Sequence, residues 1–176
     1  MNTIEITTPL SDDVISQLKV GQKILLSGTI YTARDAAHKK LVAAMQNGED
    51  CGFDPAGKII YYAGPCPAKP GSPIGPVGPT TSGRMDAYTP YLLDNGLGAM
   101  IGKGYRSPAV KESVIKNRAV YFAAIGGAAA VIMQCVKAAE VIAFEELGPE
   151  AIRKLTIEKM PLVVALDVHG GDIYVK

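Results

Sequence analysis

The sequence predicts an α/β fold, a layered domain with a mixed sheet. Segments of strand and helix character alternate along the earlier part of the chain, which is typical of parallel strands joined by helices. The final part is dominated by β-branched and alternating runs, which favours antiparallel, hairpin-like strands. With 48% hydrophobic and 20% charged residues among 176, the composition is that of a globular protein, and we expect a single domain over residues 1–176.

The first elements along the chain are a short strand, a helix, a longer strand and a second helix. Ile4 and Ile6 alternate with polar residues as in a strand, and Ser11 precedes two aspartates as the N-cap of a helix. Residues 23–33 are rich in β-branched side chains and predict a strand. Residues 34–48, RDAAHKKLVAAMQNG, have the period of a helix that ends before a glycine. Its predicted inward side chains are Leu41, Val42 and Met45.

A long loop follows the next strand. Residues 58–63, KIIYYA, predict a buried strand that leads directly into Gly64–Arg84, GPCPAKPGSPIGPVGPTTSGR. Prolines and repeated glycines interrupt this stretch, and it lacks apolar periodicity, so we expect an ordered or functional loop. Residues 85–96 then predict a helix, and residues 97–104 predict a strand.

The remaining chain predicts one capped helix, one apolar helix and further strands. Ser107 as N-cap and Pro108 at the first helical position predict the capped helix. Gly126-Gly127 opens the apolar helix, where close packing is favoured because neither glycine pattern of nucleotide-binding loops is present. The predicted strands lie at residues 119–125 and 140–146 and in a terminal β-meander over residues 151–176, with a turn at Gly170-Gly171.

Composition excludes several classes of function. Lys and Arg total 18 against 17 for Asp and Glu, so no broad basic field attracts nucleic acid or a membrane surface. The N-terminus lacks a basic and apolar leader pattern, and we expect a cytoplasmic protein without a membrane span. Cys51, Cys66 and Cys135 are odd in number and widely spaced, which argues against a disulfide framework and a metal site and favours ordinary reduced thiols.

Polar residues gather where predicted strands end, which is where α/β folds place most binding groups. Arg34, Asp35 and His38 lie at a strand-to-helix junction, with Asp35 and His38 one turn apart on one helical face. They are candidates for binding or proton transfer. An alternative is that Asp35 only interacts favourably with the helix dipole and that His38 is a surface residue.

The end of the long loop and the following strand end carry a second group of polar residues. Hydroxyls, backbone N–H groups and a guanidinium fall within a few positions, which suits binding of a carboxylate or phosphate. These candidates are Thr80, Thr81, Ser82, Gly83 and Arg84. Lys103, between two glycines, is a second cation for the same anion or an ordinary turn lysine. Together with Arg34 they suggest a dicarboxylate site, but no conventional nucleophile accompanies them, so the chain resembles half of an active site.

Several motifs carry a family resemblance. GTIYTARDAAHKK, YYAGPCPAKPGSPIGPVGPTTSGRMDAYTP, GAMIGKGYRS, VYFAAIGGAAA and DVHGGDIY occur in this order and cover nearly the whole chain. Together they closely resemble the β subunit, or C-terminal domain, of the iron–sulfur class I fumarases and the related L-tartrate dehydratases. The resemblance implies a swivelling β/β/α domain that closes over a [4Fe–4S] cluster held by cysteines of a separate α subunit, in an α2β2 assembly. This chain itself is then expected to bind no cofactor and no metal.

The resemblance also implies a reaction, the reversible hydration of fumarate to (S)-malate, and roles for individual residues. Arg34, Arg84 and Lys103 match substrate-carboxylate contacts, and Thr80 matches a proposed catalytic base. A threonine hydroxyl is a weak base unless its pKa is lowered, so Asp35 and His38 remain alternatives for the proton transfer. The residues that the resemblance implies line the substrate are Thr81, Ser82 and Gly83, and Asp86 is expected to orient Arg84 through an ion pair.

Cys66 stands where the family pattern has threonine. It is expected to be a small loop residue, or alternatively an opportunistic ligand or an oxidation target.

Other functions remain open at the level of sequence. Within the same class, the chain could be the β subunit of L-tartrate dehydratase or, more distantly, the small subunit of an aconitase-like isomerase. From other classes, it could be a non-catalytic dicarboxylate-binding or regulatory module, or a structural interaction domain whose long loop forms an interface.

Overall fold

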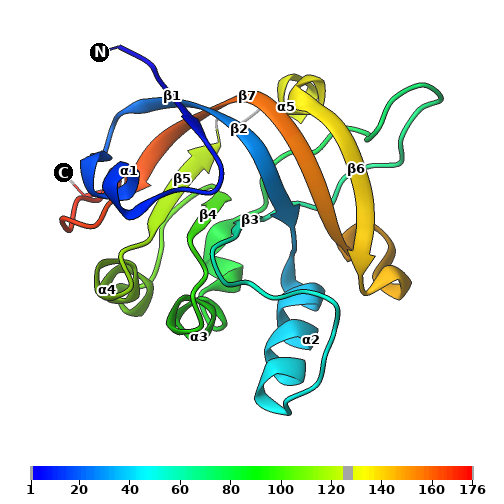
Figure 1. Cartoon of the computed structure of the whole chain (residues 1–176), viewed down its shortest axis with the longest axis horizontal. Coiled ribbons are helices and arrows are strands. Elements are labelled where there is room, and N and C mark those ends of the chain that lie inside the picture. Colours follow the sequence, from blue (N-terminus) through cyan, green and yellow to red (C-terminus); the bar gives the residue numbers. More distant parts are fainter. Residues whose placement is uncertain (1, 125–128, 176) are drawn as a thin grey trace.

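A mixed seven-stranded sheet and its flanking helices make up the computed structural model, which describes residues 2–124 and 129–175 (Figure 1). The strands are β1 (Ile4–Thr7), β2 (Lys23–Thr32), β3 (Ile59–Tyr61), β4 (Ala99–Gly102), β5 (Val120–Ala124), β6 (Val136–Ala143) and β7 (Ile152–Leu166). The α-helices are α1 (Asp12–Gln17), α2 (Asp35–Gln46), α3 (Thr89–Asp94), α4 (Pro108–Lys116) and α5 (Ala129–Cys135). Two 3-10 helices, η1 (Ser82–Met85) and η2 (Glu145–Glu150), complete the set.

The sheet closes on itself. Its strand order is β1-β2-β3-β4-β5-β7-β6, and β2 also pairs with β7. The pairs from β1 to β5 are parallel, whereas β7 is antiparallel to β2, β5 and β6. Strands β2, β3, β4, β5 and β7 thus form a closed ring. The two opposite sides of this ring and the flanking helices make up the β/β/α layers. The predicted α/β fold with a mixed sheet is confirmed, and the swivelling motion stays a prediction.

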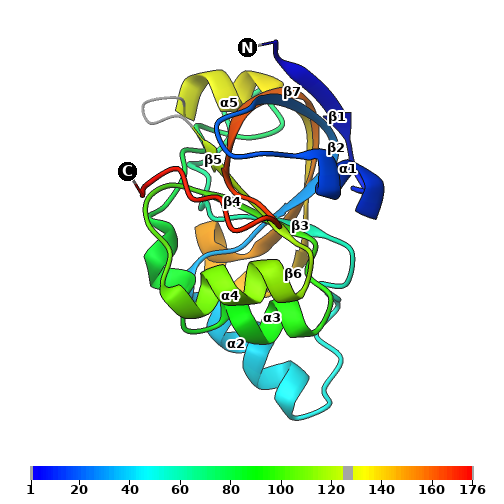
Figure 2. The same cartoon turned by 90° about the vertical axis from the view of Figure 1, so that its left-hand side faces the viewer.

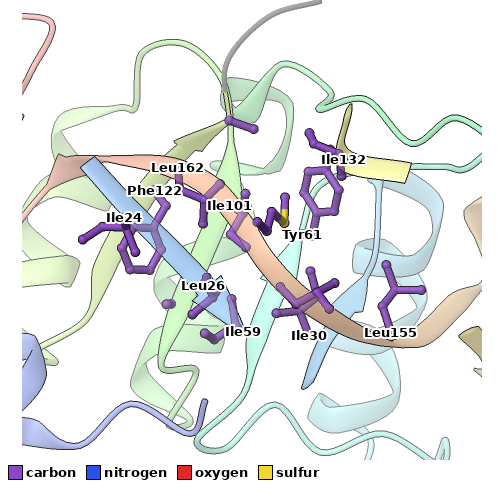
Figure 3. Close-up of a cluster of buried hydrophobic side chains, with 14 of the residues drawn as sticks. Ile24, Leu26, Ile30, Ile59, Tyr61, Ile101, Phe122, Ile132, Leu155 and Leu162 are labelled. Atoms are coloured by element: carbon purple, nitrogen blue, oxygen red, sulfur yellow. The ribbon is translucent and has the colours of Figure 1, made fainter. Parts of the chain in front are cut away.

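Two apolar clusters lie on the two faces of this sheet. The first cluster fills the ring, because alternate residues of every ring strand point to it (Figure 3). Its labelled members are Ile24, Leu26, Ile30, Ile59, Tyr61, Ile101, Phe122, Ile132, Leu155 and Leu162. The second cluster joins the outer face to α2, α3 and α4, which gather on one side of the sheet, while α5 lies on the other (Figures 1 and 2). The intervening residues of β3, β4 and β5 contribute to it, so these strands are buried on both faces.

Most predicted elements are confirmed. The hydroxyl oxygens of Ser11 and Ser107 accept hydrogen bonds from the N–H groups of Val14 and Val110, as expected of N-caps. Leu41 is fully buried in α2, whereas the predicted inward residues Val42 and Met45 are only partly buried. The loop predicted over residues 64–84 contains no helix or strand up to residue 80, whereas η1 occupies its end. Gly126-Gly127 falls outside the described residues.

The predicted terminal β-meander is wrong. Most of that stretch is one 15-residue strand, β7, and only an isolated bridge between Leu166 and Asp172 follows it. One long strand can satisfy the hydrogen-bonding groups of its backbone here, because β7 pairs with β2 and β5 as well as with β6. The turn at Gly170 is present, with φ of 88°. Within the described ranges, no helix is both long and apolar enough to cross a membrane.

Candidate anion-binding site

The candidate residues meet because β2, β3 and β4 are parallel and end at the same edge of the sheet. Thr32 pairs with Tyr61, which in turn pairs with Ile101. Arg34 therefore follows β2, and Lys103 follows β4, close to the point where the loop returns. The loop is fixed there because the Thr80 N–H donates to the Tyr62 carbonyl at 2.7 Å.

Thr81 and Lys103 lie side by side. They form an isolated parallel bridge, and the N–H of Ser82 donates to the Lys103 carbonyl at 2.9 Å. Both residues are exposed, and within residues 2–124 and 129–175 Lys103 takes part in none of the ion pairs. The site thus presents an unpaired ammonium beside threonine hydroxyls, which suits an incoming anion.

The two candidate arginines share the carboxylate of Asp35. Nε and Nη2 of Arg84 each lie 2.7 Å from Asp35 Oδ2. Arg34 Nε lies 3.8 Å from Asp35 Oδ1 and 3.8 Å from Glu150 Oε1, distances that give attraction without a hydrogen bond. Asp35 is the first residue of α2, where the helix dipole also favours a negative charge. Asp35 therefore positions Arg84 next to Arg34.

The expected ion pair between Asp86 and Arg84 is wrong. Asp86 Oδ1 instead accepts a hydrogen bond from Arg106 Nε at 2.7 Å, and Asp86 Oδ2 accepts one from the Ser107 N–H at 2.6 Å. The 3-10 turn of η1 directs Arg84 outward to solvent and leaves Asp86 facing the buried Arg106. Arg106 is only 4% exposed, and the sequence reasoning did not identify it.

His38 is fully buried, so its alternative description as a surface residue is also wrong. Its Nδ1 lies 2.8 Å from the Arg34 carbonyl, and its ring lies edge-on to Tyr62 at a centroid distance of 5.4 Å. Burial lowers the pKa of His38 from 6.5 to about 4, so the ring is neutral near pH 7. A carbonyl only accepts, and Nδ1 therefore carries the hydrogen. This arrangement anchors the turn at Arg34 and does not support His38 as an exposed proton carrier.

The hydroxyl-bearing candidates divide into two kinds. Ser82 is fully buried, and its Oγ lies 2.7 Å from the Tyr121 hydroxyl, so the prediction that its side chain contacts a substrate is not supported by this structure. Thr80 is half-buried and Thr81 is exposed, and no hydrogen bond among the described residues occupies either hydroxyl. Gly83, the second residue of η1, is exposed. The accessible donors are therefore those of Thr80, Thr81, Arg84 and Lys103.

The thiols are separate from this site and from one another. Cys66 is exposed in the long loop, and Cys51 and Cys135 are partly exposed; all three are free. Among residues 2–124 and 129–175, no group of three or more His, Cys, Asp or Glu side chains could hold a metal ion. Cys66 lines a cavity of about 450 Å³ between the long loop and β6, which contains none of the candidate site residues. The described residues do not fit the ligand set of an iron–sulfur cluster.

Comparisons with known proteins relate the whole chain to one family. The family described as "Fumarase C-terminus" matches residues 1–176. "Fumarate hydratase class I, aerobic" of Escherichia coli strain K12 is 38% identical over 175 residues, covering 97% of this chain and 32% of that protein. "Fumarate hydratase 2" of Leishmania major is 39% identical over 165 residues, covering 92% of this chain and 29% of that protein.

A shorter relative matches over most of its own length. The "Putative L(+)-tartrate dehydratase subunit beta" of Methanocaldococcus jannaschii is 39% identical over 166 residues, covering 91% of this chain and 85% of that protein. The chain thus spans about a third of the length of the fumarate hydratases and most of the length of the tartrate dehydratase subunit.

Proposed function

The chain belongs to the fumarase C-terminus family, and from this we propose that it is the β subunit of a hydro-lyase that hydrates fumarate reversibly to (S)-malate. The main structural support for this proposal is the way cationic side chains come together in the candidate site. Arg34, Arg84 and Lys103, from three separate segments, meet at one sheet edge beside the hydroxyls of Thr80 and Thr81. A planar dicarboxylate needs such a set of separated cations and hydroxyl donors.

The cations also suit the chemistry of hydration. Removal of a proton next to a carboxylate moves negative charge onto that carboxylate in the transition state. Preorganised cations that bind this charge more strongly than they bind the substrate lower the barrier. Asp35 holds Arg84 in place before substrate arrives, so less reorganisation is needed. In this proposal Arg84 and Lys103 bind the carboxylates, and Arg34 adds to the positive potential behind them.

Thr80 is the proposed proton-transfer group on this chain. Its backbone is fixed to the end of β3 through Tyr62, and its hydroxyl has no hydrogen-bond partner among the described residues. Adjacent cations favour the alkoxide form of a hydroxyl, which is the condition for a threonine to accept a proton. Asp35 is already paired with Arg84, and His38 is buried, so the geometry favours Thr80 over both.

The rest of the active site is proposed to lie on another polypeptide. The free thiols of this chain are far from a ligand arrangement, so we place the [4Fe–4S] cluster on a separate α subunit and derive no step of this chain through it. One feature supports such a partner: a relative that this chain matches over 85% of its length is named a β subunit. The α2β2 stoichiometry and a cytoplasmic location stay predictions.

A second candidate is the β subunit of an L-tartrate dehydratase. The match that covers 85% of such a subunit favours it. L-Tartrate carries one more hydroxyl than malate but has the same two carboxylates, so the cations described here would serve both substrates. The two candidates therefore differ in substrate and share the role of this chain.

The test is anaerobic purification of the tagged chain from its own host, followed by iron and sulfide analysis and assays with fumarate, malate and L-tartrate. We expect a cysteine-bearing partner with a cluster, and turnover that requires both polypeptides. Preference for tartrate would select the second candidate. A chain that purifies alone, binds a dicarboxylate and turns over none of the three would be a non-catalytic binding module and would overturn the proposal.

A further inference from the structure

A buried polar cluster lies directly beneath the candidate site. Its centre is Arg106, whose Nη2 donates to the Tyr62 hydroxyl at 3.0 Å and to Thr89 Oγ1 at 3.0 Å, in addition to the bond from Nε to Asp86. The guanidinium carbon lies 5.2 Å from the ring centre of Tyr62 and 4.7 Å from that of Tyr121. An arginine in this setting is held in one orientation by hydrogen bonds and by two aromatic faces.

Tyr121 connects this cluster to the two parts of the site above it. Its hydroxyl donates to the Gly104 carbonyl at 3.0 Å and lies 2.7 Å from Ser82 Oγ. A carbonyl only accepts hydrogen bonds, so the Tyr121 hydrogen goes to Gly104 and Ser82 must donate to the Tyr121 oxygen. One hydroxyl thus bonds to a residue next to Thr81 and to a residue next to Lys103.

We name the two parts the threonine arm, residues 80–84, and the lysine arm, residues 102–107. The arms also pack tightly, because a Cβ on Gly102 would lie 2.0 Å from Ser82 Oγ and 2.7 Å from Tyr62 Cδ2. Asp86 bonds to both Arg106 and the Ser107 N–H and so ties the lysine arm to the turn that follows the threonine arm. All these contacts are at the base of the arms, and the exposed tips keep their hydroxyls and ammonium available.

From this geometry we infer that Tyr121, seated against Arg106, is a positioning residue that fixes the lysine arm relative to the threonine arm and thereby sets the affinity for the dicarboxylate. The inference rests on the proposed function for the identity of the ligand. Its physical basis is that two charged or polar groups must hold a defined separation to contact both ends of a rigid ligand, and a displacement of about 1 Å weakens such contacts strongly. A buried hydroxyl bonded to both arms limits that displacement.

The test compares Tyr121→Phe with Tyr61→Phe in the complex of this chain with its partner. Tyr121→Phe keeps the ring against Arg106 and removes only the hydroxyl. Tyr61 is a matched control, because its buried hydroxyl donates to a loop carbonyl, that of Val77, at 2.5 Å and touches neither arm. We expect Tyr121→Phe to raise KM for the dicarboxylate about tenfold, with a smaller change in kcat, whereas Tyr61→Phe leaves KM within about twofold. Equal effects of the two variants on KM would overturn the inference and leave the proposed function standing.

A second readout does not depend on turnover. The Ser82 N–H bonds to the Lys103 carbonyl between the arms, so its hydrogen exchange reports their separation. We expect Tyr121→Phe to accelerate this exchange relative to wild type and Tyr61→Phe to leave it unchanged. If the wild-type complex turns over no dicarboxylate, the proposed function fails, and the exchange measurement alone decides the coupling: unchanged exchange at Ser82 in Tyr121→Phe would overturn it.

Discussion

Asp35 Oδ2 accepts a hydrogen bond from Arg84 Nε at 2.7 Å and lies 2.7 Å from Arg84 Nη2 in an ion pair, and so joins the first turn of α2 to η1 across 49 positions of sequence. The side chains are 33% and 55% exposed, and ion pairs of this kind stabilise a fold by at most about 1 kcal/mol. The pair therefore matters more for the orientation of Arg84 than for stability.

Asp35→Asn tests this orientation. The amide keeps the size of the side chain but removes its charge, so Arg84 is no longer held beside the site. We expect kcat for the proposed hydration to fall about tenfold. KM should stay within about threefold, because the lost orientation weakens substrate binding while the added net positive charge strengthens it. Steady-state kinetics and a melting curve on the complex measure these effects.

The matched control is Glu146→Gln, which removes another exposed ion pair of α2, the one between Lys40 and Glu146. We expect this variant to keep the wild-type kcat, since Lys40 and Glu146 form an ion pair with each other and with none of the candidate site residues. A similar fall in kcat in both variants would show that Asp35 acts through the stability of α2 rather than through Arg84.

Substitution of Arg84 itself should be more severe. Arg84→Ala removes one proposed carboxylate contact, and we expect kcat/KM to fall by about 10² to 10³ with assembly retained. Arg84→Lys keeps the charge but loses the paired donors, so its kcat/KM should lie between those of wild type and Arg84→Ala. Kinetics combined with size-exclusion chromatography checks both expectations. Loss of assembly with turnover per intact complex unchanged would favour an interface role for this residue.

The fold was predictable wherever local patterns carry the information. The caps at Ser11 and Ser107 and the change of period between β2 and α2 depend on neighbouring residues, and the sequence shows them directly. The length of β7 depends on its pairing with three other strands, and the pattern is interrupted at Lys159, whose φ of 50° marks a local irregularity. Closure of the sheet between β2 and β7 is likewise a tertiary property.

The location of the candidate site was predictable from the sequence, but the ion pairs among its residues were not. Strand ends identified Arg34, Arg84 and Lys103, because parallel strands bring their carboxyl ends together. Asp86 was the nearest carboxylate in sequence to Arg84, yet the 3-10 turn directs these two side chains to different environments. The burial of Arg106 left no local signal, because it depends on the aromatic rings of Tyr62, which follows β3, and Tyr121 on β5.

The buried His38 should make stability depend on pH. Its folded pKa of about 4 lies below the ordinary value of 6.5, so the unfolded chain takes up a proton first as pH falls. Above about pH 6.5, protonation of His38 costs the folded state no stability. As pH falls from 6.5 toward 4, the free energy of unfolding decreases because the unfolded chain binds this proton more readily. Between pH 7.5 and 5 we expect a loss of about 2 kcal/mol, measured by urea unfolding at each pH.

His38→Asn should remove most of this slope. The amide is able to donate to the Arg34 carbonyl, as Nδ1 does, but it does not titrate. A slope that survives unchanged in His38→Asn would contradict the assignment.

Asp167 should be a main stabilising carboxylate of the fold. It is 5% exposed, and its two oxygens accept hydrogen bonds from the N–H groups of Val20, His169 and Gly171, each at 2.9 Å. Burial alone would raise its pKa, but these three N–H donors outweigh burial and hold the pKa below the ordinary value of 3.8. The stability that Asp167 contributes is therefore present above about pH 4 and is lost as pH falls through its lower folded pKa.

Asp167→Asn turns one acceptor oxygen into a donor that faces a backbone N–H. We expect it to lower the free energy of unfolding at pH 7 by about 2 kcal/mol, since hydrogen bonds to a buried charge are among the stronger ones. Asp54→Asn is the matched control: Asp54 accepts from the Ala56 N–H at 3.0 Å in an exposed turn, where asparagine serves equally well, so its cost should be below about 0.5 kcal/mol. Because the deficit of Asp167→Asn reflects a lost carboxylate, it should narrow as pH is lowered from 7 to 3. A deficit that stays constant with pH would assign the effect to packing at Gly171 instead of to the charge of Asp167.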